Sequence, residues 1–176
     1  CIFGDYDVDG TAATSLLAKF FDYIKQPYFF YIPDREHDGY GPSIAVFEKL
    51  ILKKPKLIIM VDCGSTTNQS IAYLNSKQIK SIIIDHHEID KPYPKTNVLI
   101  NPKKNINNSS KDYYCATTLT YFFLEIMIKK IKSSFNLSNY LIYVLLALVC
   151  DVMPLRKINR YIALNLIKNF RIKDNV

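Results

Sequence analysis

Short apolar runs that end directly in acidic residues constrain the fold of this chain more than any other feature. The runs Leu57–Val61 and Ser81–Ile84 carry no charged residue, and an aspartate follows each at once, Asp62 and Asp85. The chain opens on Ile2–Phe3, which reads as the end of a third such run. Strands without polar alternation belong in a sheet that is covered on both faces, as parallel sheets are.

Amphipathic stretches separate these runs and predict helices. They cover Thr11–Ile24, Ser43–Leu52, Asn68–Asn75, Tyr114–Lys130, Leu137–Val149 and Arg156–Phe170, with further strands at Tyr28–Ile32 and Val98–Ile100 and a polar loop at Pro102–Asp112. The pattern predicts an α/β domain over residues 1–170. We expect a mainly parallel sheet flanked by helices in about residues 1–102 and a helical part in about residues 113–170.

Composition excludes several classes of protein. With 49% hydrophobic and 22% charged residues, the 176-residue chain is neither disordered nor fibrous. No apolar run approaches the roughly eighteen residues of a membrane span, and no basic leader precedes an apolar run. The four cysteines are widely spaced without a CxxC pair, which indicates reduced thiols in a cytoplasmic protein.

The formal net charge of +7 fits an anionic partner such as nucleic acid. Most of the basic residues are lysines, however, and a compositional bias gives the same excess. Clusters such as Lys53, Lys54 and Lys56 fit a path for phosphates or ordinary solvated surface lysines. Charge alone does not decide between these interpretations.

Three carboxylates, Asp5, Asp7 and Asp9, crowd the turn after the first strand. Like charges repel at this spacing, and a bound divalent cation removes that cost because hard cations take carboxylate oxygens. An EF-hand loop begins in the same way, but its twelfth position requires Glu where this chain has Leu16, and a helix must precede it. A solvated acidic turn remains the alternative.

Two further strands end in chemistry-bearing residues, Asp62 after one and Asp85, His86 and His87 after the next. In open parallel sheets, ligands bind at the carboxyl ends of the strands. We therefore expect all of these side chains to meet the acidic turn at one edge of the sheet.

Asp151 ends the apolar stretch that includes Leu145–Cys150. A carboxylate after so apolar a helix needs a partner, because burying an unpaired charge is costly. A second metal ion would be one such partner, and an ion pair with Arg156 or Arg160 is the alternative.

These segments resemble the DHH phosphoesterases, a family named for the run that stands here as Asp85-His86-His87. The order and spacing of six segments carry the resemblance: Gly4-Asp-Tyr-Asp-Val-Asp-Gly10, Pro33-Asp-Arg35 with Asp38-Gly-Tyr-Gly41, Val61-Asp-Cys-Gly64, Asp85-His-His87, Asn101-Pro102 and Cys150-Asp-Val-Met-Pro-Leu155. Within the family they look most like the RecJ exonucleases, which act on single-stranded DNA.

The resemblance implies two divalent cations, Mn²⁺ or Mg²⁺, at the strand ends. It implies Asp7 and Asp9 as metal ligands with Asp5 as a candidate additional ligand, Asp62 as the bridging carboxylate, and His86 and Asp151 as ligands of the second ion. His87 matches the residue that contacts the scissile phosphate, and we group Asp85 with it as catalytic. Arg35, Gly39, Tyr40 and Gly41 match motif positions that we assign to substrate binding.

The implied activity is metal-dependent 5′–3′ hydrolysis of single-stranded DNA in repair and recombination. Two cations would activate a water and clamp the attacking and leaving oxygens, so no Ser or Cys nucleophile is required. The family normally continues into a second domain (DHHA1) and, in RecJ, an OB-fold, and we expect neither in this chain. The alternatives are a phosphodiesterase for short oligonucleotides or cyclic dinucleotides, and an impaired remnant that binds DNA without cutting it.

Overall fold

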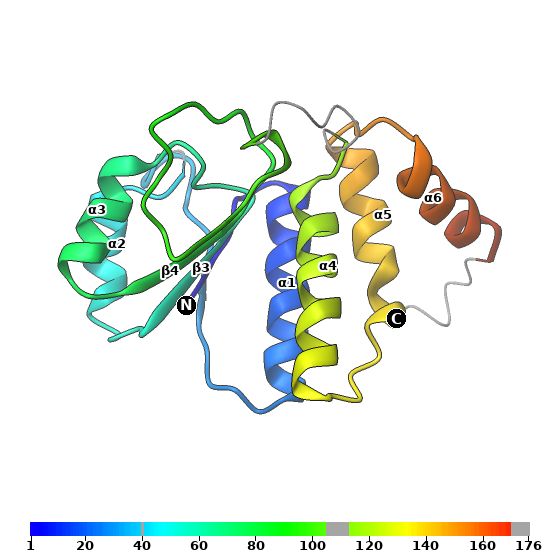
Figure 1. Cartoon of the computed structure of the whole chain (residues 1–176), viewed down its shortest axis with the longest axis horizontal. Helices are drawn as coiled ribbons and strands as arrows, with labels where there is room; N and C mark the ends of the chain where they lie inside the picture. Colours follow the sequence, from blue (N-terminus) through cyan, green and yellow to red (C-terminus); the bar gives the residue numbers. More distant parts are fainter. Residues whose placement is uncertain (40, 105–112, 170–176) are drawn as a thin grey trace.

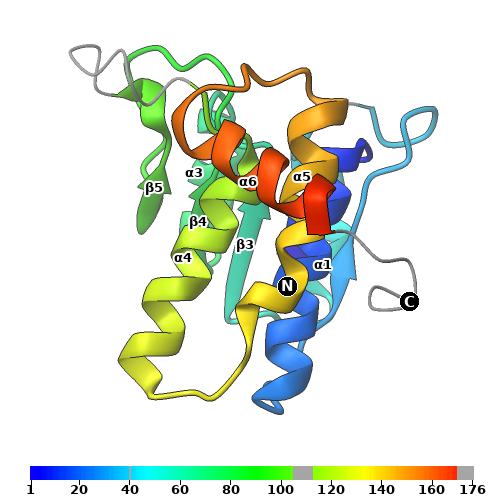
Figure 2. The ribbon, with the colours of Figure 1, turned by 90° about the vertical axis from the view of Figure 1, so that its right-hand side faces the viewer.

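The computed structural model describes residues 1–39, 41–104 and 113–169. Within them, one parallel sheet contains five strands in the order β2-β1-β3-β4-β5 (Figures 1 and 2). The strands are β1 (Ile2–Phe3), β2 (Phe30–Tyr31), β3 (Leu57–Val61), β4 (Lys80–Ile84) and β5 (Val98–Ile100). The α/β class and the parallel sheet that the apolar runs predict are confirmed.

Helices cover both faces of the sheet. On one face lie α2 (Ile44–Ile51) and α3 (Asn68–Ser76), and on the other lie α1 (Val8–Tyr23) and α4 (Ala116–Ile131) (Figure 1). A further layer packs outside α1 and α4: α5 (Leu141–Cys150) contacts both of them, and α6 (Lys157–Asn169) lies against α5 (Figure 2). No helix in the described ranges is long and apolar enough to cross a membrane.

Alternate residues of the central strand β3 enter opposite cores. In β3, Ile59 and Val61 pack with α1 and α4, while Ile58 and Met60 pack with α2 and α3. All four side chains are buried, because a strand sandwiched between helix layers has no face left for water. This double burial is the physical reason for the uninterrupted apolar runs in the sequence.

The register of β3 and β4 sets the position of the functional residues. The two strands pair from Leu57 with Lys80 to Val61 with Ile84. The next residue of each strand therefore leaves the sheet at the same level, and Asp62 N still donates to Ile84 O at 2.9 Å. Asp62 and Asp85 thus stand side by side at the carboxyl edge.

Some predicted elements differ in extent. The strand predicted over Tyr28–Ile32 is limited to Phe30–Tyr31, the two residues that pair with β1. The helix predicted from Leu137 opens with a 3₁₀ turn, Leu137–Tyr140, before α5 begins. The predicted loop starts with a 3₁₀ turn, Pro102–Lys104. Residues 105–112 of that loop and Phe170 lie outside the described ranges.

Candidate metal centre

Three strand ends and two helix ends bring the predicted ligands together. The possible ligand atoms form three overlapping groups, each with its atoms within 4.8 Å of one another: Asp5, Asp7 and Asp62; Asp62, His86 and His87; and Asp9, His86 and Asp151. We call these residues together the acidic cluster. Because Asp62 and His86 each belong to two groups, the groups join into one continuous site.

Asp62 lies at the centre of the acidic cluster. Its side chain is buried, and neither carboxylate oxygen accepts a hydrogen bond from an N–H or hydroxyl group of the described residues. Burial raises the pKa of Asp62 far above its usual range, and the charges of Asp9 and Asp7 raise it further. Its backbone is left-handed, at φ 62°, which is uncommon for a residue other than glycine. A buried carboxylate in this condition is costly unless a cation neutralises it.

His86 faces three carboxylates with one nitrogen atom. Its Nε2 lies 3.2 Å from Asp62 Oδ1, 3.5 Å from Asp151 Oδ2 and 3.6 Å from Asp9 Oδ2. A single imidazole nitrogen cannot satisfy three anions. Carboxylate oxygens gathered around an imidazole nitrogen form a donor set that suits a divalent transition-metal ion.

Asp151, at the end of α5, does not form the ion pair with Arg156 or Arg160 that was the alternative to metal binding. No arginine of the described ranges lies within ion-pair distance of it, and Arg156 stacks instead on the Tyr113 ring. Asp151 Oδ2 is buried without a hydrogen-bond partner among the described residues, and burial raises the pKa of this carboxyl. The side chain points toward the acidic cluster as a metal ligand would.

Asp9 is oriented by the N-terminus of α4, more than a hundred residues away in the chain. Its carboxylate accepts hydrogen bonds from Ala116 N at 2.6 Å and Thr117 N at 2.7 Å, and Thr117 Oγ1 donates to Asp9 O at 2.8 Å. Free N–H groups at a helix N-terminus stabilise a negative charge. Sequence reasoning missed Ala116 and Thr117, because no local pattern signals a contact made only in the folded chain.

The turn that carries Asp5 and Asp7 is shaped by tight packing. Asp7 is the N-cap of α1, with its Oδ1 accepting from Gly10 N at 2.9 Å. A Cβ at Gly10 would meet Asp5 N and O at 2.6 Å, so only glycine fits there. Burial raises the pKa of Asp5, whose side chain also belongs to the acidic cluster.

Asp85 is buried like Asp62, but both of its carboxylate oxygens accept hydrogen bonds. Its Oδ1 accepts from His86 N at 2.7 Å, His87 N at 3.1 Å and His87 Nδ1 at 2.8 Å, and its Oδ2 accepts from Ser65 N at 2.9 Å. Burial alone would raise the pKa of Asp85, but the bonds from His87 and Ser65 outweigh it, and the pKa is lowered. The bond to Asp85 in turn raises the pKa of His87, whose ring is half-exposed at the mouth of the cluster.

Of the predicted substrate-binding residues, Arg35 contacts the turn that carries Asp5 and Asp7. Its guanidinium carbon is 5.4 Å from the centre of the Tyr6 ring, and Tyr6 stands between Asp5 and Asp7 in the chain. Gly39 and Gly41 have positive φ, 76° and 73°, and Tyr40 between them lies outside the described residues.

The loop that holds Arg35 is fastened by Asp38. Its carboxylate accepts from the Tyr31 hydroxyl, from Asp34 N and from Lys49 Nζ, which ties the loop to β2 and α2. A hydrogen-bonded loop can present a side chain at a fixed place, so this anchoring suits a residue that binds substrate.

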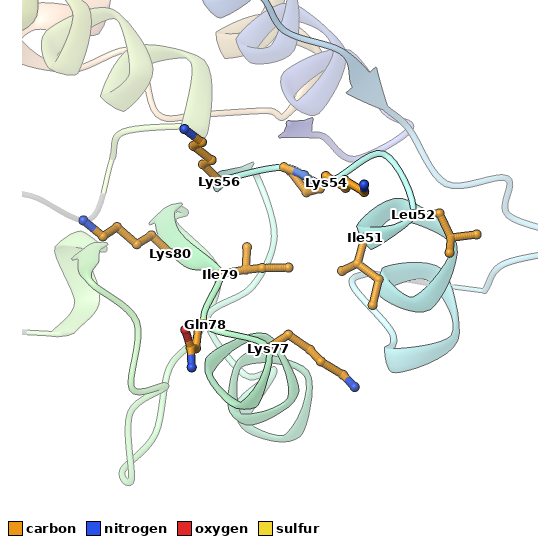
Figure 3. A pocket seen from close by; sticks show the side chains of 9 residues that line it. Ile51, Leu52, Lys54, Lys56, Lys77, Gln78, Ile79 and Lys80 are labelled. Carbon is orange, nitrogen blue, oxygen red and sulfur yellow. The ribbon is translucent and has the colours of Figure 1, made fainter.

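A hollow of about 790 Å³ lies at the opposite edge of the sheet (Figure 3). It is formed where α2 and α3 end and β3 and β4 begin, and it is lined by Lys54, Lys56, Lys77 and Lys80 around apolar residues such as Ile79. Its lining residues include no carboxylate, histidine or cysteine, so it lacks the ligands for a metal. The helix carbonyls that end there also favour lysines without any ligand.

Cys63 follows Asp62 but does not serve as a nucleophile. The thiol is buried, donates to Val61 O at 3.5 Å, and burial raises its pKa well above the usual range. Only a thiolate is reactive, so this side chain is packing.

Comparisons with known proteins agree with this geometry. Residues 1–148 match the DHH family, N-terminal domain. The single-stranded-DNA-specific exonuclease RecJ of Haemophilus influenzae is 29% identical over 174 residues, covering 92% of this chain and 30% of the relative. RecJ of Bacillus subtilis is 34% identical over 103 residues, covering 58% of this chain and 13% of the relative.

The fold is shared with a solved structure. The crystal structure of exonuclease RecJ bound to manganese superposes with a TM-score of 0.82 at 24% identity, covering 92% of this chain and 41% of that one. This chain thus spans less than a third of the length of the two curated relatives. Its acidic cluster is arranged to hold divalent cations. On the match over residues 1–148, the chain belongs to the DHH family.

Proposed function

We propose that this chain is the catalytic domain of a metal-dependent exonuclease that hydrolyses single-stranded DNA from the 5′ end. The observation that carries the proposal is Asp62, a buried carboxylate to which no described N–H or hydroxyl donates, shared by two ligand groups that His86 and Asp151 extend into a third. Two divalent cations fit this overlap, with Mn²⁺ favoured because both imidazole and carboxylate are present.

Each residue of the cluster has a separate task in this proposal. Asp62 would be the ligand shared by both cations. Asp5 and Asp7 lie on one side of it and would hold the first, while His86 and Asp151 would hold the second. The resemblance gives Asp9 to the first cation, and the structure places it within reach of His86 and Asp151 as well. When bound, the cations lower the pKa of a water molecule and offset the charge of the phosphate. Asp9 keeps its orientation through α4, and Asp7 keeps its own as the cap of α1.

Two residues with side chains open to solvent, His87 and Arg35, contact the DNA in this proposal. The Asp85 bond fixes the rotation of the His87 ring, and the raised pKa of His87 favours the charged imidazolium, which suits contact with a phosphate oxygen. Arg35 contributes a planar cation beside Tyr6, which suits a phosphate near the end of the strand.

The relatives support the choice of substrate. Both curated relatives described above are exonucleases specific for single-stranded DNA, and the solved structure contains manganese. This chain spans 30% or less of their length, so the proposal concerns the hydrolytic step itself. We place the activity in DNA repair and recombination in the cytoplasm, where the four free cysteines stay reduced.

The test is Mn²⁺-dependent release of nucleotides from single-stranded DNA labelled at the 5′ or the 3′ end. We expect release from the 5′ end, its loss in Asp62→Asn, and its retention in Asp22→Asn, the same substitution at the far end of α1. Cleavage of dinucleotides without cleavage of longer strands would indicate a phosphodiesterase for short substrates. Binding of DNA without any cleavage would overturn the enzymatic proposal.

A further inference from the structure

Asn101, directly after β5, belongs to the Asn101-Pro102 segment, for which the metal centre offers no role. Its side chain is buried. The amide Nδ2 donates to Ser65 Oγ at 2.7 Å and to His87 O at 2.9 Å, and Oδ1 accepts from Lys103 N at 2.8 Å. One side chain therefore ties together the segments after β3, β4 and β5.

These bonds lead to the His87 ring by two routes. Asn101 holds the backbone of His87 directly through its carbonyl oxygen. It also holds Ser65, whose N–H donates to Asp85 Oδ2, and Asp85 Oδ1 bonds His87 Nδ1 at 2.8 Å. Because an ionised carboxylate can only accept, Nδ1 carries a proton in this bond, and the bond fixes the orientation of the His87 ring.

We propose that Asn101 is a positioning residue that sets the place and orientation of His87 at the scissile phosphate, an inference that rests on the function proposed above. Holding the sheet together does not require this side chain. The backbone already pairs β4 with β5 up to Ile84 and Ile100, and Asp85 N donates to Ile100 O beyond the last pair. The amide acts past that point, where the residues of the cluster stand.

The first test compares Asn101→Leu with Asn75→Leu. The control removes an exposed amide on α3, whose Nδ2 donates to Lys95 O. We expect Asn101→Leu to lower kcat roughly 10- to 100-fold with KM little changed, because small misplacements of a reacting group are costly. The rise in melting temperature that Mn²⁺ produces should persist, and Asn75→Leu should behave as wild type.

A double-mutant cycle then asks whether Asn101 acts through His87. In a His87→Ala background, Asn101→Leu should change kcat less than about twofold, since the group that it positions is gone. If the losses in kcat of the two single variants multiply in the double variant, the proposal is overturned. It is also overturned if Mn²⁺ no longer raises the melting temperature of Asn101→Leu. If Asn101→Leu does not fold, Ser65→Ala breaks one of the two routes and should show a smaller loss of the same kind.

A readout independent of activity uses the metal-free protein. Long-range ¹H–¹⁵N spectra of the imidazoles should show His87 with a protonated Nδ1 in wild type and an averaged signal in Asn101→Leu. An unchanged His87 signal would overturn the positioning role. If the wild-type chain cleaves no DNA, the proposed function fails, and these spectra still decide whether Asn101 orients the ring.

Discussion

The ends of β3 and β4 carry two equally buried aspartates that differ in their hydrogen bonds. Asp62 and Asp85 follow paired residues of adjacent strands, and both are about 1% exposed. Asp85 accepts hydrogen bonds at both oxygens, and its pKa is lowered. Asp62 accepts none from the described N–H and hydroxyl groups, and its pKa is raised.

The difference separates two uses of a buried carboxylate. Asp85 is complete within the protein, so it can orient its neighbours but has little left to offer a ligand. Asp62 is incomplete, and its burial is tolerable only when a cation supplies the missing interactions. Burial and residue type are the same in both, so the number of hydrogen bonds separates the proposed metal ligand from the proposed positioning residue: from the described residues, Asp85 accepts four and Asp62 none. Asp9 lies between them, since it accepts one backbone N–H at each oxygen and keeps a lone pair on each for a cation.

Replacing each aspartate by asparagine gives the largest contrast. Asp62→Asn should lower Mn²⁺-dependent hydrolysis by about a thousandfold or more, because the carboxylate shared by both cations is lost. The measurement is the initial rate of nucleotide release at saturating Mn²⁺. A loss of less than about tenfold would show that Asp62 is not the shared ligand.

Asp85→Asn should have a smaller effect of a different kind. We expect about a hundredfold loss of kcat, because His87 loses its orienting acceptor, and a lower melting temperature, because an amide replaces a charged acceptor. The apparent affinity for Mn²⁺, measured by titration calorimetry, should change little. A large loss of Mn²⁺ affinity would place Asp85 among the direct ligands and remove the contrast.

The pH dependence of stability should distinguish the two residues without any metal. A raised pKa in the folded state means that Asp62 stays protonated while the same residue ionises in the unfolded chain. Its contribution to the free energy of unfolding therefore falls as pH rises above about 4. Asp85 has the opposite effect. Because its pKa is lowered in the folded state, its contribution to the free energy of unfolding is lost as pH falls below about 4.

Urea unfolding of metal-free protein between pH 4 and pH 7 tests the first of these statements. The free energy of unfolding of Asp62→Asn should exceed that of wild type by a margin that widens with pH, reaching about 1–3 kcal/mol at pH 7. A margin that is constant with pH would contradict the raised pKa of Asp62.

Cys63→Ala should have the smallest effect on activity, although Cys63 adjoins Asp62. Removal of a buried thiol leaves a small void and should cost about 1–2 kcal/mol of stability. The rate of hydrolysis under conditions where the variant is folded should stay within about twofold of wild type. A loss comparable with that of Asp62→Asn would implicate the thiol.

The strand ends could be predicted because parallel strands bury both faces and bring the residues after them to one edge of the sheet. Asp62, Asp85 and His86 could be placed at that edge from their positions alone, and the structure brings them together. The resemblance to the DHH family added the role expected of each residue. The extent of β2 could not be predicted, since it is defined by pairing with a strand far away in the sequence.

The difference in hydrogen bonding between Asp62 and Asp85 could not be predicted from the sequence. Both come directly after an apolar strand, and both read as candidate functional residues. They are separated by contacts made across the fold, such as Ser65 N on Asp85, just as the N-terminus of α4 orients Asp9. Ser65 and Thr117 carry no local signal of these roles.

Thermal unfolding of wild type, Asp62→Asn and Asp85→Asn during titration with Mn²⁺ tests most directly whether Asp62 is buried for a cation. We predict that Mn²⁺ raises the melting temperature of wild type and of Asp85→Asn. Metal-free Asp62→Asn should be more stable than metal-free wild type and gain little from Mn²⁺. An equal gain in Asp62→Asn, or no gain in wild type, would contradict the role of Asp62 as the shared metal ligand.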